Sequence, residues 1–244
     1  LMVLIVLTGC IGLNLRIQRI RAKLQPQREA LAQALEVNRE LATRDELTGL
    51  INRRAMLDLM ALEHRRSLRS GRPLLLAQLD IDHFKPINDQ HGHATGDRAL
   101  QAFAGTVRAS VRDTDVLARW GGEEFLLVAH AANRQEAHVI AERIRRAVAD
   151  VPFEVGGGQQ LQRTCSIGFA SFPFLEGQPR QHSWLEVVEI ADQALYMAKH
   201  GGRNAWVGLY ETATSPPESI FPQLIADAQA LLERGEARTV RSNL

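Results

Sequence analysis

Two glycines lead directly into two adjacent carboxylates in the segment RWGGEEFLLV, residues 119–128. A tight turn between apolar runs needs glycine where the backbone φ is positive, but it does not need Glu123 and Glu124. Glutamate is a poor strand former and is costly to bury without a partner. The pair is therefore either a solvated hairpin tip or a functional pair placed where a buried strand begins.

A second acidic pair stands at the end of another apolar run. The stretch LLLAQLDI predicts a buried strand that ends at Asp80, and Asp82 follows two residues later on the same face. If the hairpin around Glu123 pairs beside this strand, Asp80 and Glu123 converge. Oxygen ligands of this kind suit Mg²⁺, which takes one or two carboxylates and fills its shell with water and substrate phosphates.

Basic and amide side chains complete a candidate nucleotide site. Lys85 follows the acidic pair, and KHGGRN carries Lys199 and Arg203 at a predicted helix end with two glycines. They either cap that helix or, beside a carboxylate-bound Mg²⁺, hold a triphosphate. Asn88 and Asp97 offer an amide and a carboxylate, and such a pair can accept the N1–H and N2–H donors of guanine. Together these residues predict a nucleoside-triphosphate enzyme that uses metal ions.

The composition is ordinary for a folded domain with additions. The chain has 244 residues, 45% of them apolar and 23% charged. The net charge of +1 gives no argument for nucleic acid as a partner. The two cysteines, Cys10 and Cys165, are predicted to be free, buried thiols in a reducing compartment, and no zinc-type spacing is present.

The N-terminal segment predicts a connection to a membrane. LMVLIVLTGCIGLNL is almost continuously apolar, although shorter than the about 20 residues that span a bilayer, and the chain begins at Leu1. We expect residues 1–15 to be the end of a transmembrane helix of a longer protein, followed by a basic cluster on the cytoplasmic side. The catalytic domain would then lie in the cytoplasm at the inner membrane. A core helix of a soluble domain is the alternative interpretation.

Residues 16–42 predict a juxtamembrane coiled-coil helix. Seam positions alternate at spacings of four and three, Asn38 is a polar position that can set the register, and Pro26 should kink or restart the helix. A single packed helix can show the same pattern, but the length of the seam favours a parallel dimer. The seam consists of Leu13, Ile17, Ile20, Leu24, Gln27, Leu31, Ala34, Asn38 and Leu41.

The rest of the chain predicts a compact α+β domain over residues 43–210. Strands and helices mix without strict βαβ alternation, so we expect a central, mostly antiparallel, five-stranded sheet flanked by helices. Residues 83–89 are predicted to be a turn, the glycines at 156–158 a hairpin loop, and residues 211–244 a linker and an isolated amphipathic helix. Helices are expected at 52–70, 96–111, 133–149 and 184–199, and strands at 74–81, 163–172, 205–210 and in a hairpin over 118–129.

Five segments resemble, in order, the signature motifs of the GGDEF family of diguanylate cyclases: RDELTGLINRR, LDIDHFKPINDQHGHATGD, RWGGEEF, TCSIG and ALYMAKHGGRN. The resemblance covers about residues 43–210. It implies a fold similar to the palm of nucleotide cyclases and polymerases. It also implies that two GTP condense to cyclic di-GMP and two pyrophosphates between two domains face to face in a homodimer, which the coiled coil would align.

The same resemblance implies roles for individual residues. Asp80, the Ile81 carbonyl and Glu123 resemble the ligands of Mg²⁺, with Mn²⁺ as a substitute and two ions in each half-site. Glu123 is also the candidate for deprotonating the 3′-hydroxyl, and Glu124 supports the metal site. Asn88 and Asp97 resemble the guanine-reading pair. The residues that resemble the phosphate contacts are Lys85, Lys199 and Arg203.

A further motif resembles the family's product-inhibition site. Arg112 and Asp115 have the RxxD spacing, and Arg112 lies nine residues before Gly121, the first glycine of the acidic turn. Arg143 in AERIRR stands where a supporting arginine is often found. We therefore expect feedback inhibition by cyclic di-GMP. An exposed ion pair at a helix end, which would be worth little, is the alternative.

Three other functions remain as alternatives. The first is a catalytically silent module that binds GTP or cyclic di-GMP and signals to a partner. The second is a cyclase with a different cyclic product, which Asp97 opposes. The third is a purely structural dimerisation module, which would leave the carboxylate–lysine set unexplained. The intact set that opposes a silent module is Asp80, Asn88, Asp97, Glu123 and Lys199.

Overall fold

The computed structural model describes residues 16, 18, 21–31, 33–34, 39, 42–130, 133–158, 160–213 and 218–242. The chain divides into two compact units, residues 1–44 and 45–244. In the first unit residues 21–31 are helical, and the seam residues Leu24 and Leu31 are exposed. The expected transmembrane segment 1–15 and the seam positions 17, 20, 38 and 41 lie outside the described residues. Within the described part of the chain, no helix has the length and apolar character needed to cross a bilayer.

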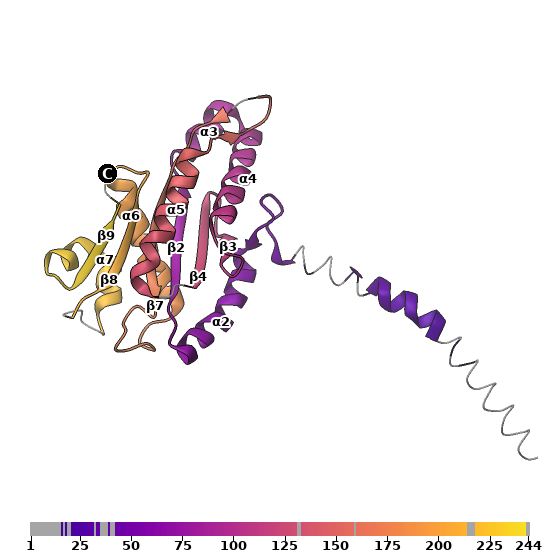
Figure 1. The fold of residues 1–244 in the computed structure, drawn as a ribbon, viewed down its shortest axis with the longest axis horizontal. Coiled ribbons are helices and arrows are strands. Elements are labelled where there is room, and N and C mark those ends of the chain that lie inside the picture. Colours follow the sequence, from indigo (N-terminus) through magenta and orange to yellow (C-terminus); the bar gives the residue numbers. More distant parts are fainter. Residues whose placement is uncertain are drawn as a thin grey trace, which may run out of the picture. The chain divides into compact units, whose positions relative to one another are not determined.

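The second unit is built on a seven-stranded sheet in the order β1-β3-β4-β2-β7-β8-β9. The β1–β3 and β7–β8 pairs are parallel, and the other four pairs are antiparallel. This confirms the α+β class and the mostly antiparallel sheet (Figure 1). The strands are β1 (Ile51–Asn52), β2 (Leu74–Ile81), β3 (Val116–Arg119), β4 (Glu124–His130), β7 (Cys165–Phe172), β8 (Trp206–Glu211) and β9 (Ala237–Arg241).

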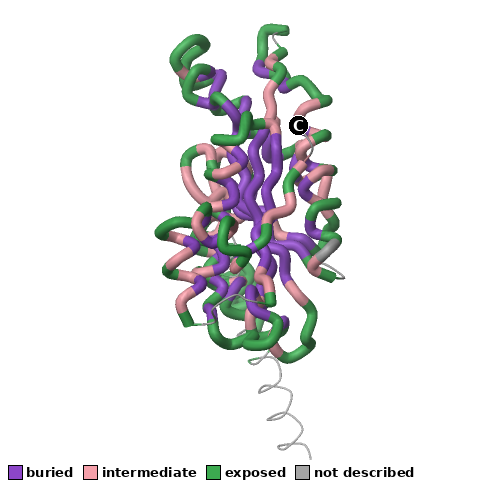
Figure 2. The backbone as a smooth tube through the Cα atoms, turned by 90° about the vertical axis from the view of Figure 1, so that its left-hand side faces the viewer, coloured by how far each residue is buried: buried purple, intermediate pink, exposed green. Residues whose placement is uncertain are grey.

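Helices cover both faces of the sheet. Residues of α3, α4 and α5 contribute to one apolar core, and residues of α2, α6 and α7 contribute to the other. The central strands are buried, while the helices alternate buried and exposed positions (Figure 2). The helices are α2 (Arg53–Ser70), α3 (Phe84–His91), α4 (His93–Ser110), α5 (Ala137–Asp150), α6 (Trp184–His200) and α7 (Ile220–Glu233).

Local sequence signals explain most of these boundaries. The Asn52 side chain accepts the Ala55 N–H and starts α2, and Gly71 ends it with a left-handed φ of 68°. Ser183 and Glu186 form a capping box at the start of α6. The glycines at 156–158 form the loop between the short strands β5 (Phe153–Glu154) and β6 (Gln160–Leu161), as expected.

The predicted turn at residues 83–89 is instead part of helix α3. Pro86 is the third residue of this helix, where N–H groups have no intrahelical partner, so proline costs nothing there. Phe84 and Ile87 are buried beneath it and hold it on the sheet. The turn prediction was therefore wrong, because proline marks the first turn of a helix as readily as it marks a loop.

The helix predicted in the C-terminal segment is present, but its predicted isolation was wrong. Helix α7 is not isolated: Ile220, Leu224 and Leu231 are buried in the core shared with α6. Strand β9 pairs with β8 from Val207 opposite Arg241 to Glu211 opposite Ala237, at the orange and yellow edge of the sheet in Figure 1. The sheet has seven strands instead of the expected five because β1 and β9 were not predicted.

Candidate active site

Three elements bring an acidic cluster and a lysine together. The β2–β4 pairing sets Asp80 opposite Glu124, and Glu123 precedes Glu124 in the turn between β3 and β4. At the end of α6, Lys199 Nζ lies 2.7 Å from Asp80 Oδ2. Asp80 is buried, with 4% of its surface exposed. The predicted convergence of the strand end and the glycine turn is therefore confirmed by the sheet register.

The electrostatics of this cluster favour a bound cation. Burial first, and then the charges of Glu123 and Glu124, raise the pKa of Asp80 to about 6 against the opposing effect of Lys199. Burial also raises the pKa of Glu123, with Glu124 adding to that rise and Lys199 opposing it. One lysine therefore does not neutralise the three carboxylates, and an added positive charge would stabilise their ionised forms.

The donor set fits a hydrated divalent cation with few protein ligands. Within residues the structure describes, no group of three or more His, Cys, Asp or Glu side chains forms a ready-made metal cage. Mg²⁺ does not need one, because it keeps several waters and binds one or two carboxylates together with substrate phosphates. The residues that would hold Mg²⁺ are Asp80, Glu123 and Ile81, which follows Asp80 and would use its carbonyl.

The two residues predicted to read guanine are neighbours across the α3–α4 junction. Asn88 lies on α3. Its Oδ1 would lie only 1.9 Å from a Cβ atom if residue 96 had a side chain, so there is room for the amide only because residue 96 is glycine. Gly96 of α4 therefore allows the amide to reach the helix turn that carries Asp97. Lys85 is exposed on the same short helix α3. This helix closely follows the acidic end of β2, so Lys85 and Asn88 lie near Asp80 in the chain.

The glycine turn has a support that sequence reasoning missed. The Arg119 guanidinium donates to the Gly122 carbonyl, with Nη2 at 2.8 Å, and its Nη1 binds the Asp45 carboxylate at 3.2 Å. Asp45 in turn accepts the backbone N–H and the hydroxyl of Thr48. The Asp-x-x-Thr spacing in RDELTG was a signal for this local turn. The ion pair of Asp45 with Arg119, 74 residues later, could not be predicted from spacing alone.

The predicted inhibitory motif is partly structural. The Asp115 carboxylate is buried and accepts the backbone N–H groups of Arg112 at 3.0 Å and His130 at 3.3 Å. It therefore does not form the exposed ion pair of the alternative interpretation. The Arg112 side chain is exposed, and so is Arg143 on α5. Asp115 fixes the loop that presents Arg112, which leaves the arginines as the groups able to meet a ligand.

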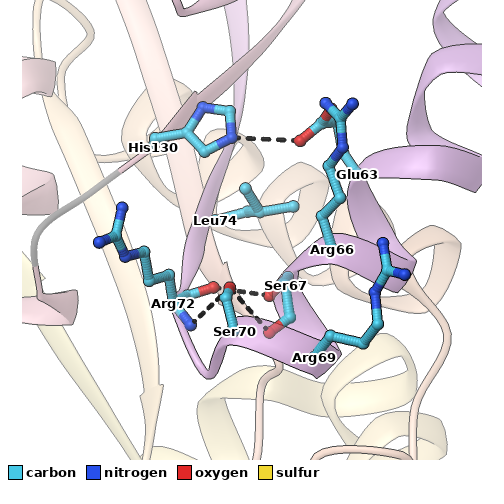
Figure 3. Close-up of a pocket in the computed structure, with 8 residues that line it drawn as sticks. All are labelled: Glu63, Arg66, Ser67, Arg69, Ser70, Arg72, Leu74 and His130. Carbon is cyan, nitrogen blue, oxygen red and sulfur yellow. Dashed lines mark hydrogen bonds and ion pairs between the residues drawn. The ribbon is translucent and has the colours of Figure 1, made fainter.

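A cavity of about 570 Å³ lies at the other end of β2, next to Leu74 (Figure 3). Arg66, Arg69 and Arg72 line it, and buried Glu63 binds both Arg66, at 2.6 Å, and the His130 ring, at 3.1 Å. None of the residues predicted to contact GTP lines this cavity. It is therefore separate from the acidic cluster at Asp80.

The domain thus combines an α+β fold with an acidic strand end, an acidic glycine turn and a facing lysine. The family described as "Diguanylate cyclase, GGDEF domain" matches residues 42–205. This chain belongs to the GGDEF family. Enzymes of this family that make cyclic di-GMP generally use divalent metal ions.

Several characterised proteins resemble the chain. Diguanylate cyclase DgcP of Pseudomonas aeruginosa is 45% identical over 170 residues, which is 70% of this chain and 24% of that protein. Response regulator PleD of Caulobacter vibrioides is 38% identical over 193 residues, 78% of this chain and 41% of PleD. The chain thus spans between a quarter and two fifths of the length of these relatives.

Solved structures show the same fold. The coiled coil and GGDEF domain of DgcB from Caulobacter crescentus, in complex with c-di-GMP, matches with a TM-score of 0.68 and 32% identity, covering 77% of this chain and 96% of that one. Diguanylate cyclase SiaD from Pseudomonas aeruginosa, in complex with its activator SiaC, matches with a TM-score of 0.62 and 35% identity. The match covers 81% of this chain and 74% of the SiaD chain. The palm-like fold is therefore confirmed.

Proposed function

We propose that this chain carries a diguanylate cyclase domain that condenses two GTP into cyclic di-GMP and two pyrophosphates. The observation that carries the proposal is the cluster of Asp80, Glu123 and Lys199, in which one buried and one half-buried carboxylate outnumber the single cation that faces them. Family membership and the relatives named as diguanylate cyclases support it. Divalent metal ions that accompany a nucleoside triphosphate would supply the positive charge that this cluster lacks.

The residues divide the work by their chemistry. Asp80, Glu123 and the Ile81 carbonyl would hold Mg²⁺ or Mn²⁺, with two ions in each half-site. When bound, such ions lower the pKa of the attacking hydroxyl and stabilise charge on the α-phosphate and the leaving pyrophosphate. Glu123 would also accept the proton of the 3′-hydroxyl as a general base. Glu124 supports this cluster.

Binding contacts complete the half-site. Lys199 and Arg203 at the end of α6, with Lys85 on α3, hold the triphosphate by charge-assisted hydrogen bonds. Asn88 and Asp97 bind the edge of guanine, since a carboxylate accepts both of its ring-edge N–H donors. Adenine presents a different donor pattern there, so this pair selects GTP over ATP.

Turnover requires two copies of the chain. One half-site holds one GTP, so two catalytic domains must face each other, and residues 16–42 are proposed to align them as a coiled coil. The apolar segment 1–15 would anchor the dimer to the inner membrane, with the catalytic domain in the cytoplasm. Both proposals are argued from the sequence. The matched DgcB structure contains a coiled coil and a GGDEF domain, and it supports the proposed coiled coil at residues 16–42.

Metal removal tests the proposed chemistry. We expect GTP turnover to stop in excess EDTA and to return when Mg²⁺ or Mn²⁺ is added beyond the chelator, because the carboxylates of Asp80 and Glu123 repel the triphosphate unless cations lie between them. Nucleotides resolved by liquid chromatography would measure this, with ATP as the control substrate. Undiminished turnover in EDTA would contradict the metal site, and equal use of ATP would contradict the guanine contacts.

Product inhibition is predicted to depend on Arg112. Replacing Arg112 by alanine keeps its backbone N–H, and with it the bond to Asp115 that shapes the loop. We therefore expect the variant to fold normally, to keep its initial rate within about twofold, and to lose inhibition by added cyclic di-GMP by about tenfold or more. Asp113 is the next residue of the same loop and is also exposed, so Asp113→Ala is the matched control. Unchanged inhibition of the Arg112 variant would show that the inhibitory site is elsewhere.

A further inference from the structure

The turn that follows α6 carries Arg203, one of the proposed phosphate contacts, in an uncommon backbone conformation. Arg203 and Asn204 have left-handed φ values of 64° and 44°. Residues other than glycine adopt this region only at a cost, and they persist there when surrounding contacts fix them. The Arg203 N–H donates to the Ala198 carbonyl at 3.1 Å, and Lys199 reaches Asp80. The contacts that fix this turn therefore decide where Arg203 points, and they hold the C-terminal end of α6, which carries Lys199.

Asp82 holds the turn from the sheet side. Its carboxylate is buried and accepts the backbone N–H of Asn204 at 2.9 Å. It also accepts the hydroxyls of Thr164 and Ser166, each at 2.7 Å. These neutral donors, together with the Asn204 N–H, occupy both oxygens of the carboxylate. Asp82 thus ties the turn to β7 and to the end of β2, two residues from Asp80, and it does not join the acidic cluster.

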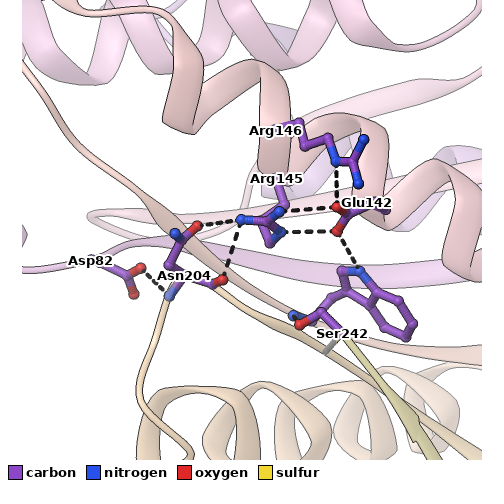
Figure 4. A network of polar contacts seen from close by, with 7 residues as sticks. Asp82, Glu142, Arg145, Arg146, Asn204 and Ser242 are labelled. Carbon is purple, nitrogen blue, oxygen red and sulfur yellow. Dashed lines mark hydrogen bonds and ion pairs between the residues drawn. The ribbon is translucent and has the colours of Figure 1, made fainter. Parts of the chain in front are cut away.

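Arg145 holds the same turn from α5 (Figure 4). Its Nη1 donates to Asn204 Oδ1 at 2.8 Å, while Nε and Nη2 bind the two carboxylate oxygens of Glu142 at 2.9 Å. Hydrogen bonds from Arg145 above all, and from Trp206 and Arg146, lower the pKa of Glu142 to about 2 against the effect of burial. A guanidinium fixed by a bidentate partner has few alternative positions, so it presents Nη1 to Asn204 in one geometry.

The C-terminal segment fastens the strand that leaves this turn. The Trp206 indole N–H donates to Glu142 at 2.9 Å, which joins the start of β8 to the same network. Ser242 accepts the Trp206 backbone N–H at 3.2 Å, and its own N–H donates to the Trp206 carbonyl at 3.1 Å. Ser242 lies beyond the residues that match the family, which end at 205. The family motif alone therefore does not supply the whole support.

We propose that Asp82, Arg145 and Glu142 are positioning residues that hold the 199–204 turn so that Lys199 and Arg203 meet the triphosphate of GTP. This inference rests on the proposed function. The residues do not touch the substrate and act through Asn204, which both Asp82 and Arg145 contact. Loosening the network should weaken binding of the triphosphate and leave contacts to the base unchanged.

Two arginines on the same helix turn provide a matched comparison. Arg145→Met and Arg146→Met each remove one guanidinium that binds Glu142, but only Arg145 contacts Asn204. For Arg145→Met we expect hydrogen exchange at the Asn204 amide to accelerate about tenfold or more and GTP affinity to fall about tenfold, with GMP affinity changing less than twofold. Arg146→Met should change neither measurement by more than about twofold. Arg145→Lys, whose amine keeps one of the two partners, should recover part of the loss.

The outcomes separate the inference from the proposed function. Equal effects of Arg145→Met and Arg146→Met on exchange and on the GTP-to-GMP affinity ratio would overturn the positioning role. If Arg145→Met does not fold, Asn204→Gly tests the same contact, because it removes the amide and relieves the left-handed φ. That variant should also lose GTP affinity about tenfold, and unchanged affinity would overturn the inference. A wild-type domain that binds no GTP would overturn the proposed function, while the exchange comparison would still decide the positioning role.

Discussion

Replacing Asp80 by asparagine is expected to abolish cyclic di-GMP formation and, in the absence of metal, to stabilise the domain at pH 7. The activity is lost because the amide is a weaker metal ligand and carries no charge. The stability rises because the ionised carboxylate is costly in this buried, acidic setting, which raises its pKa from 3.8 to about 6. A shift of that size corresponds to an upper estimate of about 3 kcal/mol.

The pH dependence of this gain has a definite sign. The folded state holds the Asp80 proton more tightly than the unfolded state, so the wild type loses stability as pH rises from about 4 to about 6. The difference between Asp80→Asn and the wild type should therefore be near zero at pH 4 and reach its full value above pH 6. Denaturant unfolding in EDTA across this range measures it.

Controls define what would contradict the prediction. Asp113→Asn removes an exposed carboxylate and should change neither activity nor stability appreciably. Added Mg²⁺ should stabilise the wild type and not the Asp80 variant, since only a ligand that binds the folded state raises stability. A variant that is less stable than the wild type at pH 7 without metal would show that Asp80 is a structural residue and not a carboxylate held at a cost for function.

Replacing Glu123 by glutamine is expected to lower the rate of GTP turnover about 10³-fold or more while the domain still folds and binds GTP. The amide has nearly the same shape, but it cannot accept the proton of the 3′-hydroxyl and it removes one negative charge from the cluster. General-base catalysis alone contributes about 10² to 10⁴ in rate, and lost metal ligation adds to this. Single-turnover assays and equilibrium binding of a GTP analogue measure the two quantities separately.

Glu124→Gln is the matched control for this change. Glu124 is the adjacent residue, it is exposed, and it opposes Asp80 in the sheet register. Because its proposed role is only to support the cluster, we expect its replacement to cost about tenfold or less. Equal losses for the two variants would mean that Glu123 has no special role as a base. A normal rate for Glu123→Gln would remove it from the chemistry altogether.

Much of the fold could be predicted because its signals are local. The eight-residue strand β2 is wholly buried and reads as a continuous apolar run, and α2 has its N-cap and its terminal glycine in the sequence. The convergence of Asp80 and Glu123 also followed from sequence, since a hairpin that pairs beside β2 can bring its acidic turn to only one end of that strand. The free, buried state of Cys165 is likewise confirmed.

The features that sequence reasoning missed depend on distant contacts. Strand β9 (ARTVR) has little apolar character of its own and exists because the edge of β8 is available to it. Asp82 was placed beside Asp80 by the alternation of a strand, but its partners are two hydroxyls 82 and 84 residues later and a backbone amide 122 residues later. Arg145 and Asn204 are 59 residues apart, and the presence of one residue type does not predict the other as its partner. Such pairs become visible only once the elements are packed.

The most direct test of the central claim is the product formed by two facing domains. Residues 43–242 fused to a leucine zipper, which forces the dimer, would be incubated with GTP and Mg²⁺, and the nucleotides resolved by mass beside the Glu123→Gln variant. We predict that the wild type forms cyclic di-GMP and pyrophosphate and that the variant forms neither. Bound but unconverted GTP in the wild type would contradict the cyclase and favour a nucleotide-binding signalling module.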